Sequence, residues 1–496
     1  MRAIALVGTV VFAAVIVLPL VALGALGGTA PYGGPLPAYP DTSALFIQNG
    51  AFLDRFGDAT LARSPAKKVA ISLRYRAELD LLHFVDTDQV ISGTEGWLFY
   101  KGDFFGCVQP ARYAQMARQL DVMSRLAGAS GVLLEFAVAP NKSTTYADKL
   151  GPLNWAYTHC AAANTQAFDS ALARFAPTVV RNSISLAEGR RRYPEINLFY
   201  HTDTHWTPFS AALAFRQLLA TLPGIDAAAL PPPKLGQKRA VMTDMYANML
   251  IRTDLEAVTV LDPATEAKLP VLTFHHPVFL GDSFYNMLKP TIAHSFPGVV
   301  QAHIDDAKDY WIALQEADLI VASGVERYFL SRTLSGAMQW ESPFGRALVA
   351  RNETAAAATC GGFKEIGTGD VTALHNVEQR GADWAVTGDA PQLIFAVPPA
   401  GAGLARCLTI DYTAGRAVTM ELFLPSAGAS SFASGRSVQL PLTAGQGRIE
   451  LRLPSGMDGP TIRLDPGERA ADRLSIRMVA LGTAAGVVEP AAGDGR

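Results

Sequence analysis

The chain has 496 residues, 49% of them hydrophobic and 18% charged, so it can bury a full core and is long enough for two or three domains. Its formal net charge is −3 and its pI is near 6.3, which argues against a nucleic-acid-binding protein, because such proteins carry a basic face. Aromatic residues make up 9% of the chain, which is typical of a folded rather than a disordered protein.

The N-terminus carries an apolar run, residues 3–28, which follows Met1-Arg2 and has no charged residue after it before Asp41. This run exceeds the roughly 20 apolar residues that a bilayer requires. We therefore interpret residues 1–28 as an uncleaved signal-anchor or as a signal peptide cut near Ala25–Ala30. Both interpretations place the rest of the chain outside the cytoplasm, and the length of the run favours the anchor.

Residues 29–43 are rich in Pro and Gly and predict a linker. Residues 44–345 then alternate between helical periodicity and short apolar runs, which predicts an α/β domain in three layers around a parallel sheet. Residues 222–270 show no periodicity that places an element. The expected elements are a mostly helical segment at 44–84, a hairpin at 88–100, helices at 111–129, 161–175 and 185–193, a helix that begins at Thr207-Pro208, and strands at 131–140, 178–180, 271–280 and 318–322.

The pattern of apolar and polar residues changes near residue 370. Short runs of alternating polarity recur from there, separated by Gly, Pro, Ser and Asp, which predicts an all-β sandwich over residues 371–487. Residues 346–370 are expected to link the two domains, and residues 488–496 are expected to form a disordered tail.

The chain has four cysteines, and an exported chain with an even number permits disulfides. Four cysteines allow three pairings, among which proximity in the sequence favours Cys107–Cys160 and Cys360–Cys407. No CxxC pair is present, which argues against a zinc site built on cysteine.

Ser283 is the candidate nucleophile. It lies in Gly281-Asp282-Ser283-Phe284, where the apolar run that begins at Val271 meets the start of an amphipathic segment. A serine on such a strand–turn–helix junction is exposed, and its backbone N–H lies where an oxyanion would be stabilised. Asp282 is interpreted as a turn residue rather than a catalyst.

A serine nucleophile needs a base, and the segment from Tyr200 to Thr207 offers the best one. His205 is the candidate general base, and Asp203 is the candidate acid that orients its imidazole. If the segment is extended, His201, Asp203 and His205 share one face, because side chains alternate along a strand. Those three residues therefore also allow a metal hydrolase as an alternative, with His275 and His276 as further ligands. A metal hydrolase, however, would have no need of a serine at the end of a strand.

Taken together, these motifs resemble the SGNH-hydrolase-like domain of the alginate O-acetyltransferases. The resemblance covers about residues 45–335, and the Asp-x-His pair precedes the serine, as it does in that family. The segments that carry it are Asp203-Thr204-His205-Trp206, Gly281-Asp282-Ser283-Phe284, Gly93-Thr94-Glu95-Gly96-Trp97-Leu98-Phe99-Tyr100 and Ala139-Pro140-Asn141-Lys142-Ser143.

The resemblance implies a periplasmic enzyme that acetylates the hydroxyl groups of an alginate-like exopolysaccharide through an acetyl-Ser283 intermediate. It also implies that a multi-pass membrane O-acyltransferase supplies the acetyl group, and it calls for no metal or cofactor. Arg327 and Tyr328, which follow a predicted strand, are candidates for oxyanion or substrate contacts, and Lys142 could approach the site from the end of the 131–140 strand. The C-terminal sandwich resembles a carbohydrate-binding module.

Two other functions remain open at this point. A polysaccharide acetyl esterase would use the same three residues with water as the acceptor, and the difference lies in how well the site excludes water. A non-catalytic polysaccharide-binding protein would keep the fold, but it would have no use for Asp203, His205 and Ser283 together.

Overall fold

The computed structural model describes residues 65–104, 106–249, 251, 255–262, 268–397, 406–424, 432–454, 460–467 and 473–484. The predicted signal-anchor, the 29–43 linker and the 488–496 tail lie outside these residues. Within the described ranges, no helix is both long and apolar enough to cross a bilayer.

A five-stranded sheet forms the centre of the first domain. Its strand order is β4-β3-β9-β7-β8, and every neighbouring pair is parallel, as the apolar runs in the sequence predicted. Because the strands are parallel, all their carboxyl ends lie along one edge. The strands are β3 (Leu133–Ala139), β4 (Val180–Arg181), β7 (Pro277–Gly281), β8 (Val300–His303) and β9 (Leu319–Val325).

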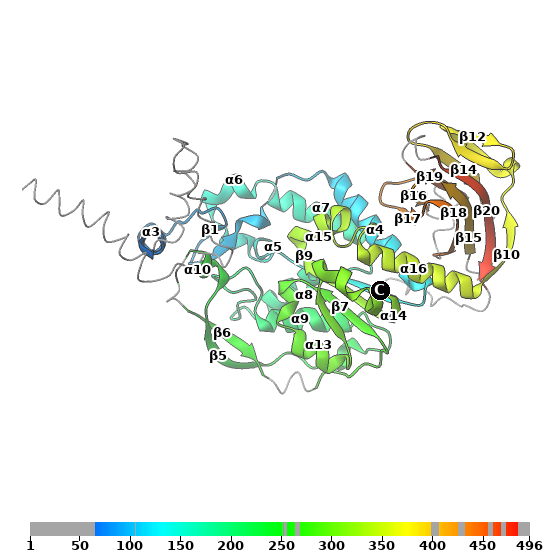
Figure 1. Cartoon of the computed structure of the whole chain (residues 1–496). Helices are drawn as coiled ribbons and strands as arrows, with labels where there is room; N and C mark the ends of the chain where they lie inside the picture. Colours follow the sequence, from blue (N-terminus) through cyan, green and yellow to red (C-terminus); the bar gives the residue numbers. More distant parts are fainter. Residues whose placement is uncertain are drawn as a thin grey trace, which may run out of the picture.

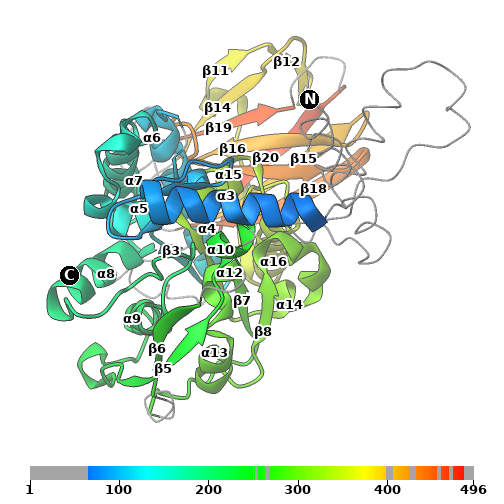
Figure 2. The ribbon, with the colours of Figure 1, turned by 90° about the vertical axis from the view of Figure 1, so that its left-hand side faces the viewer.

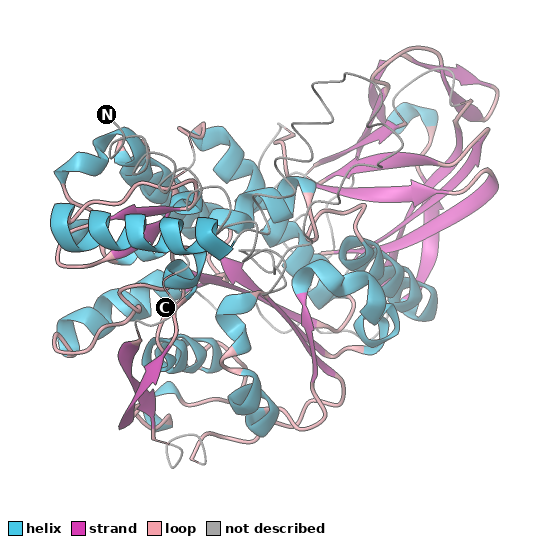
Figure 3. Cartoon of the chain, turned by 60° about the vertical axis from the view of Figure 1, so that its left-hand side comes forward, coloured by secondary structure: helices cyan, strands magenta, loops and turns pink. Residues whose placement is uncertain are grey.

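Helices cover both faces of this sheet, which gives the predicted three layers (Figure 3). Successive strand residues point to opposite faces, so Phe136 joins one hydrophobic core and Ala137 the other. One core includes residues of α4 (Pro110–Ala129), α7 (Ala161–Phe175), α14 (Trp311–Glu316), α15 (Glu326–Ser335) and α16 (Pro343–Thr359). The other includes residues of α8 (Asn182–Arg192), α9 (Pro208–Leu219) and α13 (Lys289–Ser295).

Smaller elements surround the edge where the strands end. The predicted hairpin forms, with antiparallel pairing of Val90 to Tyr100. A second hairpin, β5–β6, and a short helix occupy the 222–270 stretch, for which the sequence predicted nothing (Figure 2). The elements are α3 (Pro65–Leu82), β1 (Val90–Ser92), β2 (Leu98–Tyr100), α5 (Lys142–Thr145), α6 (Trp155–Thr158), β5 (Leu235–Val241), α10 (Asp244–Asn248), β6 (Glu256–Leu261) and α12 (Ser283–Asn286).

The C-terminal domain consists of two antiparallel sheets, as predicted (Figure 1). One has the order β11-β14-β19-β16-β17, and the other has the order β12-β13-β20-β15-β18 with β10 also paired to β20. The strands are β10 (Cys360–Glu365), β11 (Val371–His375), β12 (Val377–Arg380), β13 (Asp383–Val386), β14 (Gln392–Ala396), β15 (Arg406–Ala414), β16 (Val418–Phe423), β17 (Ser437–Leu442), β18 (Gly445–Leu453), β19 (Thr461–Pro466) and β20 (Ser475–Ala484).

Both predicted disulfides are present. Cys107–Cys160 joins the segment before α4 to the start of α7, and Cys360–Cys407 joins β10 to β15. Each bridge therefore closes a loop within one domain, and neither crosses between domains.

The segment 346–370 is not the loose linker that the sequence suggested. Most of α16 lies in it, followed by β10 (Figure 1). The helix begins with Pro343 as its first residue, and the Ser342 side chain accepts a hydrogen bond from the Gly345 N–H, which caps the helix. The helix packs against α4 on one side and β18 on the other, so the connection between the domains is itself part of the core.

Asn352 on α16 ties the two domains together. It is fully buried, and its side-chain amide donates to the carbonyl of Leu126 on α4 and to that of Arg452 on β18. Its side-chain oxygen accepts the backbone N–H of Arg452 at 2.9 Å. A single side chain thus satisfies three buried backbone groups from both domains.

We expect Asn352→Ala to lower the free energy of unfolding by about 3 kcal/mol, because it removes the side chain that binds the buried N–H and carbonyl of Arg452, whereas the carbonyl of Leu126 keeps the Ser130 hydroxyl. Urea denaturation followed by circular dichroism measures this loss. Thr354→Ala, an exposed position on the same helix, is the matched control and should change stability by less than about 0.5 kcal/mol. Equal effects of the two substitutions would contradict a bridging role for Asn352.

Candidate active site

Ser283 lies at the junction between β7 and α12, at the carboxyl edge of the central sheet, and its side chain is exposed. Asp282 holds the turn. One of its carboxylate oxygens accepts a hydrogen bond from the N–H of Phe284 at 3.0 Å, and the other accepts hydrogen bonds from the N–H of Val325 at 2.8 Å and from Arg332 Nη1 at 3.1 Å. Asp282 therefore acts as a turn residue, which ties the serine to the end of β9.

Gly281 is required here by close packing. A Cβ at this position would lie 2.9 Å from Ser323 Oγ and 3.0 Å from Tyr285 Cβ, which is too close for any other residue without a shift. The turn that presents Ser283 therefore fits directly against β9.

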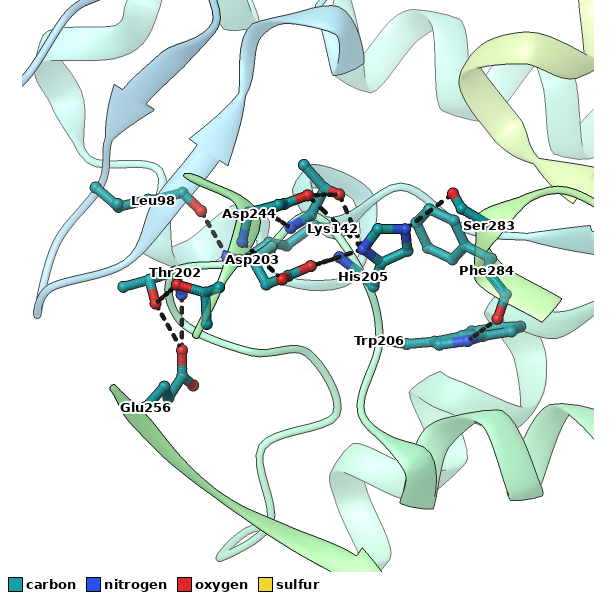
Figure 4. Close-up of polar contacts among 12 residues, drawn as sticks. Leu98, Lys142, Thr202, Asp203, His205, Trp206, Asp244, Glu256, Ser283 and Phe284 are labelled. Carbon is teal, nitrogen blue, oxygen red and sulfur yellow. Dashed lines mark hydrogen bonds and ion pairs between the residues drawn. The ribbon is translucent and has the colours of Figure 1, made fainter. Parts of the chain in front are cut away.

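The structure brings Ser283, His205 and Asp203 into one chain of hydrogen bonds (Figure 4). His205 Nδ1 lies 2.7 Å from Asp203 Oδ1, and His205 Nε2 lies 2.9 Å from Ser283 Oγ. With the Nδ1 proton donated to the carboxylate, Nε2 is left to accept the serine proton. These distances suit transfer of that proton to the imidazole.

The pKa values of the pair reflect their contact. Burial alone would lower the pKa of His205, but the hydrogen bond and charge of Asp203, with a further contribution from Asp244, outweigh burial and raise it above its ordinary value. Burial likewise opposes ionisation of Asp203, yet its bonds to His205 and to the Asp244 N–H hold the pKa of this carboxyl below its usual range. The aspartate is therefore an anion at neutral pH.

The loop that carries Asp203 and His205 is bent, not extended as the alternation argument assumed. Its backbone is held by Glu256, whose carboxylate accepts the N–H of His201 at 2.7 Å and the N–H and hydroxyl of Thr202 at 3.0 and 2.8 Å. The N–H groups of His201 and Thr202, which would pair with a neighbouring strand in an extended segment, thus bind a side chain instead. The loop is therefore free to turn at this point. As a result His201 and His205 do not face the same way.

Asp244, at the start of α10, is a site residue that the sequence did not reveal. Its N–H donates to Asp203 Oδ2 at 2.9 Å, and its carboxylate accepts the N–H and hydroxyl of Thr204. That carboxylate lies 3.7 Å from His205 Nδ1, so a second acid stands beside the imidazole. Burial, followed by the charge of Asp203, raises the pKa of Asp244. Asp244 falls in the stretch without usable periodicity, and no motif marks it.

The five-residue metal set considered from the sequence is not assembled. The His201 ring lies 3.0 Å from the Asn197 side-chain nitrogen and packs on Trp97. His275 and His276 precede β7, at the end of the sheet opposite Ser283. Both are exposed and lie outside β7, so the predicted strand at 271–280 begins later than expected, at Pro277. Their backbone N–H groups bind Asp318, which keeps them out of the strand.

Among the described residues, Asp203, His205 and Asp244 do place ligand-type atoms within 4.8 Å of one another. These atoms are already engaged. Asp203 and His205 bind each other, and the carboxylate of Asp244 binds Thr204. The geometry is that of an oriented imidazole rather than an open set of metal ligands.

Arg327 and Tyr328 lie in the first turn of α15, close to Ser283. The Arg327 side chain is 6% exposed, pairs with Asp103 at 2.9 Å and lies over the ring of Phe284, with 5.3 Å between Cζ and the ring centroid. Its Nε has no partner among the described residues. Tyr328 is 39% exposed, and its hydroxyl interacts with Tyr100. Arg327 thus lies beside Phe284, the neighbour of Ser283, and is not a surface residue.

A partly open cavity of about 710 Å³ borders the Arg327–Asp103 pair. Asn141 forms part of its wall, and Asn141 Oδ1 accepts the backbone N–H of Arg327. Its lining combines hydroxyl and amide side chains with three carboxylates, those of Asp103, Asp148 and Glu326, and does not include Ser283.

Residues 90–269 match the family model of the SGNH hydrolase-like domain of the acetyltransferase AlgX. The resemblance drawn from the sequence is therefore confirmed for this part of the chain, which includes Asp203 and His205 and ends before Ser283. The search of curated protein sequences gives no significant match.

Among solved structures, the chain is similar to the O-acetyltransferase domain of Pseudomonas putida AlgJ, with 18% identity and a TM-score of 0.35 over 49% of this chain and 92% of that one. Pseudomonas aeruginosa AlgX gives 14% identity and a TM-score of 0.35 over 80% and 94%. A xylan-binding module from Roseburia intestinalis gives 13% identity and a TM-score of 0.20 over 25% and 96%. At these identities and TM-scores the similarities carry no weight for activity or ligand.

We expect Asp203→Asn to lower the pKa of His205 by at least about one pH unit, because it removes the charge that stabilises the imidazolium. Titration of the His205 ring by NMR measures this value. Asp226→Asn, an exposed position outside the site, is the control and should leave the titration unchanged. A His205 pKa that does not move in Asp203→Asn would show that the carboxylate does not govern the imidazole.

Proposed function

We propose that the protein is a periplasmic O-acetyltransferase that moves an acetyl group through Ser283 to hydroxyl groups of an alginate-like exopolysaccharide. The observation that carries this proposal is the hydrogen-bonded chain Ser283–His205–Asp203, with distances of 2.9 and 2.7 Å. The family match of residues 90–269 supports acetyl transfer over other uses of the same three groups.

In the first step, His205 Nε2 takes the proton of Ser283 while Oγ attacks the acetyl carbonyl of the donor. The tetrahedral intermediate then collapses, and the leaving group takes the proton from His205, which leaves acetyl-Ser283. In the second step, His205 takes the proton of a sugar hydroxyl, whose oxygen attacks the acetyl-serine. The acetyl group passes to the sugar and the proton returns to Ser283.

Asp203 serves both steps. Bound to Nδ1–H, it keeps the imidazole in the tautomer whose Nε2 is free to accept a proton, and as an anion it stabilises the imidazolium that forms. Asp244 supports Asp203 through its backbone N–H and adds negative charge near Nδ1.

The oxyanion of each tetrahedral intermediate requires hydrogen-bond donors near Ser283. We assign this role to the backbone N–H of Ser283 and name Arg327, whose guanidinium lies against the ring of Phe284, as the second candidate donor. Tyr328 is the further candidate, as a contact to the sugar.

The location and partners belong to the same proposal. The apolar run of residues 3–28 supports export with a membrane anchor, and the two disulfides suit an oxidising compartment. A multi-pass membrane O-acyltransferase would then supply the acetyl group from the cytoplasmic side. The C-terminal sandwich is proposed to hold the polysaccharide while it is modified.

The decisive experiment incubates the soluble part, without residues 1–30, with a chromogenic acetyl ester, with and without polysaccharide, and follows the polymer by mass spectrometry. We expect acetyl gain on the polymer, and Ser283→Ala should reduce kcat by about 10⁵- to 10⁶-fold. Ser335→Ala, an exposed serine on α15, is the control and should retain full activity.

The outcomes separate the alternatives. Ester cleavage that depends on Ser283, without transfer to any polymer tested, identifies an acetyl esterase with the same three residues. Turnover that Ser283→Ala leaves intact, or no turnover at all, contradicts the proposal and leaves a polysaccharide-binding protein as the better account.

The role of Arg327 is tested with the double substitution Arg327→Met with Asp103→Asn, which avoids leaving a buried carboxylate alone. We expect kcat to fall by about 100-fold, as for the loss of one oxyanion donor. Asp103→Asn alone is the control for the loss of the ion pair. If the double variant retains kcat within threefold of that control, Arg327 does not stabilise the oxyanion.

A further inference from the structure

Lys142 is a buried lysine whose ammonium group is fully occupied by backbone carbonyls. It is the first residue of α5, directly after β3 of the central sheet, and it is 1% exposed. Its Nζ donates to the carbonyl oxygens of Leu98 at 2.5 Å, His201 at 2.6 Å and Asp203 at 3.1 Å (Figure 4). An ammonium group has three protons, so each proton has one carbonyl acceptor.

The surroundings of Lys142 combine apolar rings with distant negative charge. The Nζ atom lies 5.1 Å from the ring centroid of Trp97 and 5.4 Å from that of Phe99. Burial lowers the pKa of Lys142 to about 7, against the opposing influence of the carboxylates that face it, which are Glu256, Asp203, Asp244 and Asp103. A charged lysine in this position lowers the free energy of unfolding, because its charge is removed from water. That cost calls for a compensating role.

The three carbonyls identify the role. Those of His201 and Asp203 belong to the bent loop that carries His205, and that of Leu98 belongs to β2. Lys142 itself continues from β3, which pairs with β9, and β9 pairs with β7, the strand that ends at Ser283. The other two side chains that hold the loop, Glu256 and Asp244, come from the β5–β6 hairpin and α10, which do not pair with the central sheet. Lys142 therefore connects the loop to the central sheet, whose strand β7 leads to Ser283.

We propose that Lys142 is the positioning residue that sets the position of the Asp203–His205 loop relative to Ser283. The proposal rests on the proposed function, since it assumes that His205 acts on Ser283. Lys142 does not contact substrate, because its ammonium group is enclosed. Its loss moves the Asp203 and His205 backbone, and a misplacement of about 1 Å at reacting groups is enough to cost about 100-fold in rate.

The test compares Lys142→Met, which keeps the length of the side chain but cannot donate, with Lys149→Met as the control. Lys149 lies a short distance along the chain, and its ammonium forms only an ion pair with Glu95 near the surface. We expect Lys142→Met to lower kcat for acetyl ester cleavage about 100-fold with KM within threefold of wild type. Lys149→Met should retain both values.

A second readout does not depend on turnover. In protein labelled with ¹⁵N-histidine, the Nδ1 proton of His205, bound to Asp203, gives a resonance far downfield. We expect this resonance to shift or broaden in Lys142→Met and to remain in Lys149→Met and in Ser283→Ala. If wild type shows no Ser283-dependent turnover, the proposed function fails, while this resonance still reports whether Lys142 positions the loop.

Folding of Lys142→Met is checked by circular dichroism, because the substitution removes the side-chain donor of three carbonyls, among which that of His201 keeps the N–H of Leu98. If it does not fold, Lys142→Gln retains two N–H donors and should give a smaller loss of kcat in the same direction. If that variant also fails, Lys142→Arg serves as the third variant, because it keeps a cation that donates but changes its size and shape, and it should also shift the His205 Nδ1 resonance. Folded variants with kcat within threefold of wild type and an unshifted His205 resonance would overturn the proposal.

Discussion

The parallel pairing of the central sheet is the constraint on which the candidate site depends. Because β3, β9 and β7 run in one direction, the segments that follow them emerge at a single edge, and these segments carry Lys142, Arg327 and Ser283. Residues more than 100 positions apart in the sequence are brought together without any loop having to cross the molecule. The close packing of Gly281 against Ser323 of β9 then fixes the position of the turn that carries Ser283.

The base that acts on this serine comes from outside the sheet, on a bent loop that has little regular structure of its own. The loop is held instead by charged side chains that bind its backbone, with Glu256 and Asp244 on its N–H groups and Lys142 on its carbonyls. Other peptide groups of the loop have backbone partners, such as the carbonyls of His201 and Thr202, which accept the N–H groups of Leu98 and Met245. These bonds hold the bent loop while the side chain of His205 projects towards Ser283.

The C-terminal sandwich is joined to the α/β domain by packing as well as by chain connection. Helix α16 contacts both α4 and β18, and Asn352 binds backbone groups on each side of the boundary. A further contact pairs Arg436 of the sandwich with Asp121 of α4. The two domains therefore present their surfaces in a defined relation.

The sequence by itself determined the elements whose signals are local. Apolar runs predicted the buried strands, alternating polarity predicted the sandwich, and short spacing predicted both disulfides. Gly281-Asp282-Ser283 after an apolar run, and Asp203 two residues before His205, were enough to nominate the central residues of the site, because each of those signals spans only a few positions.

Only the tertiary structure decided the rest. It bent the loop at Asp203, separated His201 from His205, placed His275 and His276 at the far end of the sheet and turned the expected linker into α16. It also introduced Asp244 and Glu256, and it showed which groups bind Lys142, for which the sequence predicted only an approach to the site. The partners of these three residues lie between 40 and 61 positions away along the chain. The physical reason is that these side chains bind backbone groups, and a backbone group carries no signature in the sequence that would identify its distant partner.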